Sequence, residues 1–300
     1  MNKSYSYLLA PFCLILAMFL WGSSFIALKL AFMDFHPMLV IFGRMAIASL
    51  AFLCFLPKFR GIRVRKQDWK LLAAMALAEP CLYFIFEALA LKNTSASQAS
   101  VITTMLPLLV SVSSAFLLAE KFSFTNYAGL FLAMSGAIAL SLGGEVSSQA
   151  PNPLLGNFYE FIAMVCAAVY TIAVKHLSNR YPALFITAFQ ALIGAFFFAP
   201  FLLLPSVSWP SPLPTVSTTA IIYLGLAVTT LAYGLYNFSL SLMDAGKAAV
   251  YINLIPLFTM GLGWLIFNET FTTMQYLAGI TIFTGVGLSQ NFWTKTTKCV

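Results

Sequence analysis

Two glutamates and a tyrosine interrupt an otherwise apolar stretch, residues 78–92, which reads AEPCLYFIFEALALK. Glu79, Tyr83 and Glu87 follow one another at intervals of four residues. On an α-helix each such step turns by ~40°, so the three side chains would share one stripe about 80° wide. Carboxyl groups inside a membrane mark substrate sites or proton relays. This spacing therefore predicts a polar stripe that binds a substrate or a proton.

Arg44 is a basic residue expected at a similar depth, between the levels of Glu79 and Glu87. Two interpretations stay open. Arg44 and one glutamate form a purely structural ion pair, or at least one glutamate contacts substrate or carries a proton. The sharper form of the second is that Glu79 exchanges a proton for a cationic or zwitterionic metabolite. Pro80 lacks an N–H and should bend the helix beside Glu79, providing a hinge.

The elements that hold these residues are expected to be membrane-spanning helices. Hydrophobic residues make up 61% of the 300-residue chain and charged residues only 8%, against roughly 25% charged in a soluble domain. A transmembrane helix needs ~20 apolar residues. The sequence predicts ten such spans, near residues 8–30, 37–57, 69–91, 97–118, 125–142, 157–177, 183–204, 218–240, 248–267 and 273–292. The fold class is an all-α polytopic membrane protein.

The net charge of +7 reflects basic residues beside the spans and not a nucleic-acid site. Six basic residues crowd the loop after the second span: Lys58, Arg60, Arg63, Arg65, Lys66 and Lys70. Positively charged loops face the cytoplasm. Both termini are therefore predicted to be cytoplasmic, in the cytoplasmic (inner) membrane of a bacterium.

The two halves of the chain resemble each other. An offset of 149 pairs Pro107 with Pro256 and Glu120 with Glu269. Each copy, residues 1–145 and 146–300, then holds five spans, and an odd number forces the second copy to enter the membrane from the opposite side. Inverted repeats around a central cavity are typical of secondary transporters. Pro107 and Pro256 are interpreted as symmetry-related helix breaks or hinges, with simple kinks as the alternative.

Several motifs resemble the drug/metabolite transporter superfamily, EamA-type branch. They are WGSSFIALK (21–29), ALALKNTSASQASVITTMLPLL (88–109), LLAEKFSFTNYAG (117–129), LMDAGKAAVYINLIPLF and FNETFTTMQYLAG. The resemblance implies ten helices in two inverted bundles of five, with the fifth and tenth peripheral. It also implies small polar or amphiphilic metabolites as cargo and, in many members, export. The Trp21–Gly22 pair has Ala167–Ala168 as its counterpart, so Trp21 has no symmetric partner.

Other polar residues are weaker candidates. A set in the eighth and ninth spans either lines the cavity or forms interhelical hydrogen bonds: Tyr233, Tyr236, Asn237, Tyr251 and Asn253. Lys29 and Lys175 occupy equivalent span ends as gates or as anchors that reach the membrane surface. Small residues in the fifth span, Gly129, Ala133, Ala137 and Ser141, suit either intramolecular packing or a homodimer seam.

The remaining function classes are narrowed by missing motifs. The sequence contains no H-E-x-x-H, G-x-S-x-G or G-x-x-x-x-G-K-[ST], and no metal-type cysteine spacing. No catalytic residue, metal or cofactor is expected, and the expected partners are a small-molecule substrate and the lipid bilayer. The residues and the resemblance together predict proton-coupled transport of an amino acid, amine or related compound by alternating access. That the direction is export, as an antiporter, is what the resemblance implies. An uncoupled facilitator or channel, an uptake carrier, and a receptor without transport remain alternatives.

Overall fold

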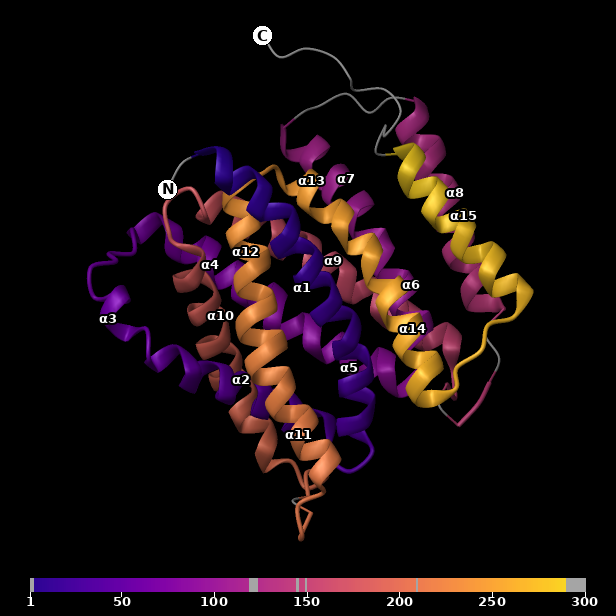
Figure 1. The fold of residues 1–300 in the computed structure, drawn as a ribbon, viewed down its shortest axis with the longest axis horizontal. Helices are drawn as coiled ribbons and strands as arrows, with labels where there is room; N and C mark the ends of the chain where they lie inside the picture. Colours follow the sequence, from indigo (N-terminus) through magenta and orange to yellow (C-terminus); the bar gives the residue numbers. More distant parts are fainter. Residues whose placement is uncertain (1–2, 119–123, 144–145, 149, 209, 290–300) are drawn as a thin grey trace.

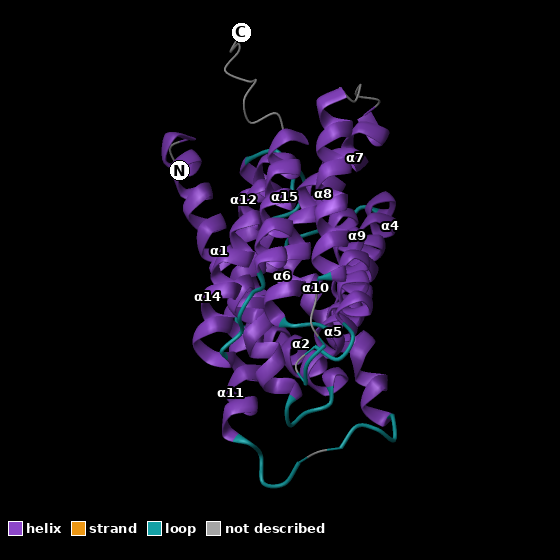
Figure 2. Ribbon diagram, turned by 90° about the vertical axis from the view of Figure 1, so that its right-hand side faces the viewer, coloured by secondary structure: helices purple, strands orange, loops and turns teal. Residues whose placement is uncertain are grey.

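The fold is described from a computed structural model, covering residues 3–118, 124–143, 146–148, 150–208 and 210–289. Helices dominate these residues, and no strand occurs among them beyond a single bridge between Ser147 and Ala150. Figure 1 shows the helices as a bundle, and Figure 2 shows them running roughly alongside one another with most loops at the two ends.

Both halves contain a similar succession of helices. The first half comprises α1 (Lys3–Phe32), α2 (Pro37–Leu53), the short α3 (Leu56–Phe59), α4 (Trp69–Ala76), α5 (Tyr83–Asn93), α6 (Ala96–Ile102), α7 (Leu106–Leu118) and α8 (Phe124–Leu142). The second comprises α9 (Pro153–Leu177), α10 (Ala183–Phe198), α11 (Thr215–Tyr223), α12 (Tyr233–Leu242), α13 (Ala245–Val250), α14 (Ile255–Phe267) and α15 (Thr273–Ser289). Two π-helical segments, η2 (Leu77–Leu82) and η5 (Leu224–Ala232), join α4 to α5 and α11 to α12. Two 3₁₀-helical turns, the narrow turns η3 (Thr103–Met105) and η6 (Tyr251–Leu254), join α6 to α7 and α13 to α14.

The chain is a multi-pass membrane protein. Seven helical stretches of the described residues are long and apolar enough to cross a membrane, and three further apolar helices are shorter. Large apolar side chains lie on the outside, including Phe131 (77% exposed) and Phe196 (70%), while glutamates and an arginine are buried inside. This distribution suits a molecule surrounded by lipid. The count of ten spans stays a prediction.

Local sequence explains where several helices begin. The Asn152 side chain accepts a hydrogen bond from the Leu155 backbone N–H (3.2 Å), and Pro153 takes the first helical position of α9. The Ser95 hydroxyl caps α6 in the same way, through the Gln98 N–H (3.1 Å). Such caps satisfy N–H groups that have no partner inside the helix.

Prolines mark equivalent interruptions in the two halves. Pro107 and Pro256 each stand in the first turn of a helix, α7 and α14, directly after the narrow turns η3 and η6. Both prolines sit where a 3₁₀-helical turn gives way to an α-helix within a continuous helical span, and the hinge and simple-kink interpretations both stay predictions. A proline tolerates the first turn of a helix because its missing N–H would be unpaired there anyway.

Helices from the two halves pair with opposite chain directions. The Asn152 N–H at the start of α9 donates to the Asn93 carbonyl at the end of α5 (2.9 Å), and Arg180, just after α9, pairs with Asp68, just before α4 (2.5 Å). Likewise the Ser217 hydroxyl in α11 bonds the Leu30 carbonyl near the end of α1 (3.0 Å), and the Ser239 hydroxyl in α12 bonds the Ala10 carbonyl near its start (3.2 Å). Antiparallel pairing of this kind is what two copies of opposite orientation produce.

The small-residue stripe of α8 is used within the molecule. A β-carbon added at Gly285 of α15 would lie 2.4 Å from the Ala133 backbone nitrogen and 2.8 Å from the Gly129 carbonyl oxygen. Figures 1 and 2 both show α8 and α15 side by side. The two helices thus pack backbone to backbone, which only small residues allow. A homodimer stays a prediction, and it would need another surface.

The charged residues at span ends bind neighbouring helices and not the membrane surface. Lys29 is buried (7% exposed) and interacts electrostatically with Glu269. Glu269 accepts a hydrogen bond from the Ser97 backbone N–H at the start of α6 (3.2 Å). The Lys175 ammonium donates to the Leu240 and Met243 carbonyls at 3.0 and 2.8 Å. The burial of Lys29 contradicts the interpretation of this residue as an anchor at the membrane surface. Glu120, which the sequence offset pairs with Glu269, lies outside the described residues.

Candidate functional site

A small, partly open cavity lies between the two halves of the chain. Its volume is about 40 Å³, and its walls come from α1, α2, η2, α5, η3, α7, α9, α12, η6 and α14. The lining residues are Trp21, Ser24, Phe25, Arg44, Glu79, Tyr83, Glu87, Thr103, Leu106, Met164, Ala167, Tyr170, Thr171, Tyr233, Tyr236, Ile252 and Ile255. This space holds a few water molecules, whereas metabolite pockets measure roughly 300–1,000 Å³. The cavity is therefore too small for a metabolite in this structure, and this contracted arrangement is called the closed conformation below.

The backbone break at Pro80 places Glu79 in this cavity. Glu79 has φ −146° and ψ 117°, an extended conformation inside an otherwise helical span. The residue before a proline avoids the helical region because the proline ring would clash with it. The stripe predicted on one continuous helix is thus interrupted, yet Glu79, Tyr83 and Glu87 all line the same cavity.

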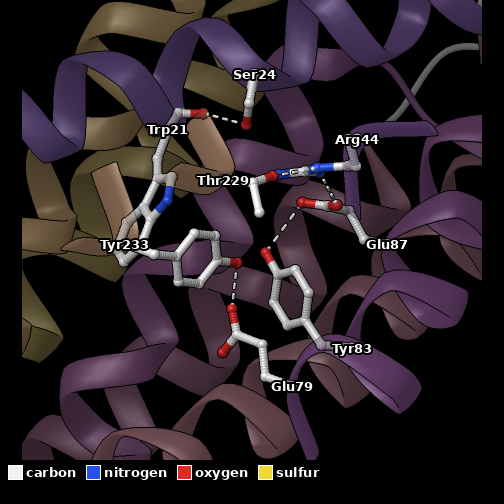
Figure 3. A network of polar contacts seen from close by, with 8 residues as sticks. All are labelled: Trp21, Ser24, Arg44, Glu79, Tyr83, Glu87, Thr229 and Tyr233. Carbon is white, nitrogen blue, oxygen red and sulfur yellow. Dashed lines mark hydrogen bonds and ion pairs between the residues drawn. The ribbon is translucent and has the colours of Figure 1, made fainter. Parts of the chain in front are cut away.

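Glu79 meets a tyrosine from the other half of the chain. The Tyr233 hydroxyl of α12 donates a hydrogen bond to the Glu79 carboxyl, as Figure 3 shows. Both residues are buried, Glu79 being 4% exposed. This contact links the two halves through the candidate site itself.

Arg44 lies against Glu87. Its Nη1 is 3.8 Å from a Glu87 carboxylate oxygen, and its Nε donates to the Thr229 hydroxyl at 2.9 Å (Figure 3). The guanidinium also lies 4.3 Å from the centre of the Phe84 ring. The Tyr83 hydroxyl donates to the other oxygen of Glu87 at 3.0 Å. Of the two glutamates, Glu87 is therefore the one that Arg44 approaches, and Glu79 has a tyrosine as its partner.

Aromatic rings and unused donors complete the cavity. The Trp21 ring packs against Tyr233 and Tyr236, with centroids 5.0 and 4.9 Å apart. Trp21 Nε1 and Arg44 Nη1 are buried and have no hydrogen-bond partner among the described residues. Buried donors normally find partners. These two are available to a ligand or to water, while the aromatic faces can attract a cation.

Three predicted residues lie away from the cavity. Asn237 is fully buried, and its amide donates to the Thr187 hydroxyl (2.9 Å) while its oxygen accepts from Tyr170 (2.8 Å). Asn237 therefore forms interhelical hydrogen bonds, which was the alternative to lining the cavity. Tyr251 and Asn253, in η6, are half-buried and do not line the cavity either.

Sequence reasoning missed Tyr170, Thr229 and Glu160. Tyr170 lines the cavity, and Thr229 holds Arg44. Only the three-dimensional packing shows these roles, because both side chains are common inside membrane helices. Glu160 carried a usable signal: it is an acid inside the predicted sixth span, and the structure buries it completely. Among the described residues no cluster of three or more histidines, cysteines or acids can hold a metal ion.

A comparison with family models now places the chain. The model of the EamA-like transporter family matches it twice, over residues 8–142 and 154–290. The chain belongs to the EamA-like transporter family. The two matches cover the two halves in which the helices pair with opposite directions.

Other EamA-like sequences align along nearly the whole chain. An uncharacterized transporter of Archaeoglobus fulgidus is 27% identical over 277 residues, covering 92% of this chain and 95% of the relative. The uncharacterized transporter YetK of Bacillus subtilis is 29% identical, covering 90% and 83%. A solved crystal structure matches with a TM-score of 0.68 at 21% identity, covering 94% of this chain and 98% of that one, and it shares the fold. The relatives are transporters in name, and this chain is a membrane transporter.

Proposed function

We propose that the protein is a secondary transporter that moves an amine-bearing metabolite, an amino acid or a related compound, out of the bacterial cytoplasm in exchange for protons. The observation that carries this is the cavity between the two halves, whose lining includes an acid, Glu79, and two nitrogen donors without a hydrogen-bond partner. A concave site with a few convergent polar groups is the usual form of a small-molecule site.

The ligand class follows from the charges around the cavity. The Glu79 carboxylate is suited to an ammonium group, and the tyrosine and tryptophan rings beside it add cation–π attraction. Arg44 Nη1 is suited to a carboxylate or another acceptor at the opposite end of the ligand. A zwitterion would use both ends, while a simple amine would use only Glu79.

The mechanism follows from the closed cavity and the paired halves. A volume of about 40 Å³ cannot accept a metabolite, so the walls must separate before substrate enters. Two inverted copies rocking about a midplane site provide such a motion, opening the cavity to one side at a time. In this scheme both termini lie on the cytoplasmic side, and the proton gradient drives the cycle.

Glu79 couples the substrate to the proton in this proposal. When the cavity is empty, a protonated Glu79 avoids an uncompensated buried charge. When an ammonium group binds from the cytoplasm, the carboxyl O–H bond breaks, the proton passes to cytoplasmic water, and the carboxylate pairs with the cation. The Tyr233 hydroxyl stabilises the ionised form by donating to it.

The test combines ligand binding and flux on purified protein. Thermal-shift screening against amino acids, polyamines and nucleosides should find a stabilising amine-bearing compound. In proteoliposomes, its transport should run uphill when a pH gradient is imposed. Flux that never exceeds the compound's own gradient would instead identify a facilitator.

Two variants locate the coupling. Glu79→Gln keeps the shape and should abolish pH-driven transport, whereas normal pH-driven transport by this variant would overturn the role of Glu79. Tyr233→Phe removes one hydrogen bond to a charged group, roughly 1.5–3 kcal/mol, and should weaken substrate binding about 10-fold or more. Tyr251→Phe is the matched control, since Tyr251 lies outside the cavity.

A further inference from the structure

Glu160 is a second buried acid that the proposed substrate site does not use. It lies in α9, is 0% exposed, and does not line the cavity. Neither of its carboxyl oxygens has a hydrogen-bond partner among the described residues. Every other acid in the membrane core has one: Glu79 accepts from Tyr233, and Glu87 accepts from Tyr83.

The groups around Glu160 offer it no positive charge. From α5, Glu87 and Tyr83 act on it electrostatically; the first repels an ionised Glu160, and the Tyr83 proton is already donated to Glu87. Arg44 pairs with Glu87, at 3.8 Å.

The other elements packed against α9 add no compensating cation. The described parts of α6, η3, α7 and α8 carry no charged side chain, while η2 brings Glu79, and α12 brings Tyr233 and Tyr236. The lysines of α4, α5 and α13 (Lys70, Lys92 and Lys247) are exposed and lie at helix ends.

An ionised carboxylate in this place would be costly. Removing a charge from water without a partner costs several kcal/mol even after the protein relaxes. A neutral carboxylic acid costs far less, because only its dipoles are buried. The closed conformation is therefore compatible with a protonated Glu160 and not with an ionised one.

A polar route leads from one end of the molecule toward Glu160. Asn157, one turn earlier on α9, accepts from the Thr94 hydroxyl (2.9 Å) and donates to the Gln98 side-chain oxygen (3.2 Å). These groups adjoin the junction where the Asn152 N–H meets the Asn93 carbonyl. Residues three apart on a helix are neighbours on one face, so Asn157 and Glu160 continue the same line of polar groups. Beyond Glu160 the line reaches Glu87 and the cavity.

We propose that Glu160 is a second proton-binding site of this transporter, separate from the substrate cavity. Its carboxylic O–H bond is intact in the closed conformation. When the molecule opens to the outside, which by the predicted orientation is the Thr94–Asn157–Gln98 end, water there supplies the proton that forms this bond. When the molecule opens to the cytoplasm, the bond breaks and the proton passes to cytoplasmic water, leaving the carboxylate hydrated until the next outward opening. The role in transport depends on the proposed function, whereas the protonated state itself does not.

The first test is spectroscopic and needs no substrate. A protonated carboxyl has an infrared C=O stretching band that an ionised carboxylate lacks. The difference spectrum of wild type minus Glu160→Gln, recorded at neutral pH, should contain this band, shifted when the sample is exchanged into D₂O. Glutamine is close in shape to the neutral acid, so the variant should fold. Glu160→Asp is the second variant, and it should move the band rather than remove it.

The control is Glu269→Gln, which keeps an oxygen for the Ser97 N–H. Glu269 lies beside Lys29, and its replacement should leave the acid band unchanged. Absence of the band from both the Glu160→Gln and the Glu160→Asp comparison would overturn the proposal.

The second test measures stoichiometry. If Glu79 and Glu160 each exchange one proton per substrate, a gradient of one pH unit at zero membrane potential should sustain a substrate ratio of about 100-fold in wild type. Glu160→Gln should reduce this to about 10-fold while leaving substrate binding intact. An unchanged ratio would exclude a transport role for Glu160. If the infrared band is present but no substrate flux is found, the proposed function is wrong, while the assignment of Glu160 as a proton-binding site still holds.

Discussion

At the scale of single residues, Arg44 shows how a charge is kept inside a membrane protein. It is 1% exposed, and Glu87, Thr229 and Phe84 each contact a different part of its guanidinium. A desolvated ion pair of this kind contributes little net stability, but removing one partner leaves the other charge uncompensated.

We therefore expect Arg44→Met to destabilise the protein by about 3–5 kcal/mol, because it strands Glu87 in a buried position. The double variant Arg44→Met with Glu87→Gln should recover much of this loss, since no charge then remains unpaired. Thermal unfolding in detergent measures both. If Arg44→Met unfolds at the wild-type temperature, the buried Glu87 does not need the charge of Arg44 to be stable in the folded protein.

The candidate site was partly predictable at this scale. Glu79, Tyr83, Glu87 and Arg44 were found because ionisable groups inside apolar segments stand out in the sequence, and all four line the cavity. Contacts across the halves could not be found that way. The pairing of Tyr233 with Glu79 depends on how α12 packs against the first half, and the sequence of one span does not contain that information.

At the scale of elements, the close approach of α8 and α15 depends on glycine. A β-carbon at Gly285 would overlap backbone atoms of Ala133 and Gly129, which cannot move aside as a flexible side chain can. In contrast, nothing lies within 4 Å of a β-carbon added at Gly279 of the same helix.

Gly285→Ala should lower stability by roughly 1–3 kcal/mol, the usual cost of overpacking, because α15 must move away from α8. Gly279→Ala is the matched control, and it should be neutral or stabilising by up to about 1 kcal/mol, since alanine favours a helix. Melting temperatures in detergent compare the two. Equal changes in melting temperature for the two variants would show that the close contact between α8 and α15 does not determine the stability of the protein.

Element positions were predictable because apolar length and proline both leave marks in the sequence. The third span was expected at residues 69–91, and the structure has α4, η2 and α5 over Trp69–Asn93. The extended backbone at Glu79 was not expected in detail. A proline predicts a bend, but which residue leaves the helical region depends on neighbours, such as Gly194 of α10, where a β-carbon would lie 2.7 Å from Pro80.

At the scale of the whole molecule, a polar cluster joins the two halves at one end. Asp68 is 3% exposed and accepts from Arg180 (2.5 Å) and from the Tyr181 hydroxyl (2.7 Å). The Arg65 backbone N–H also donates to that hydroxyl (3.1 Å). By the predicted orientation this end faces the cytoplasm, so the cluster must separate, at least in part, when the cavity opens there.

Asp68→Asn should raise the population that is open at this end. Weakening the cluster by about 1.4 kcal/mol would raise the ratio of open to closed molecules tenfold. The measurement is the labelling rate of a cysteine placed in the cavity, Ala167→Cys, by a membrane-impermeant reagent added from that side. Asp244→Asn is the matched control, because its pair with Lys247 (3.1 Å) is exposed, and exposed pairs contribute little. An unchanged labelling rate in Asp68→Asn would show that the cluster does not keep the cavity closed at this end.

The position of Trp21 has a practical consequence. Its indole ring lies among phenol rings and beside the carboxyl that is proposed to lose a proton. Indole emission responds to nearby charge and hydration, so replacing the remaining tryptophans with phenylalanine would leave a single built-in optical reporter. Ligand arrival could then be followed in real time by fluorescence, without attaching any dye.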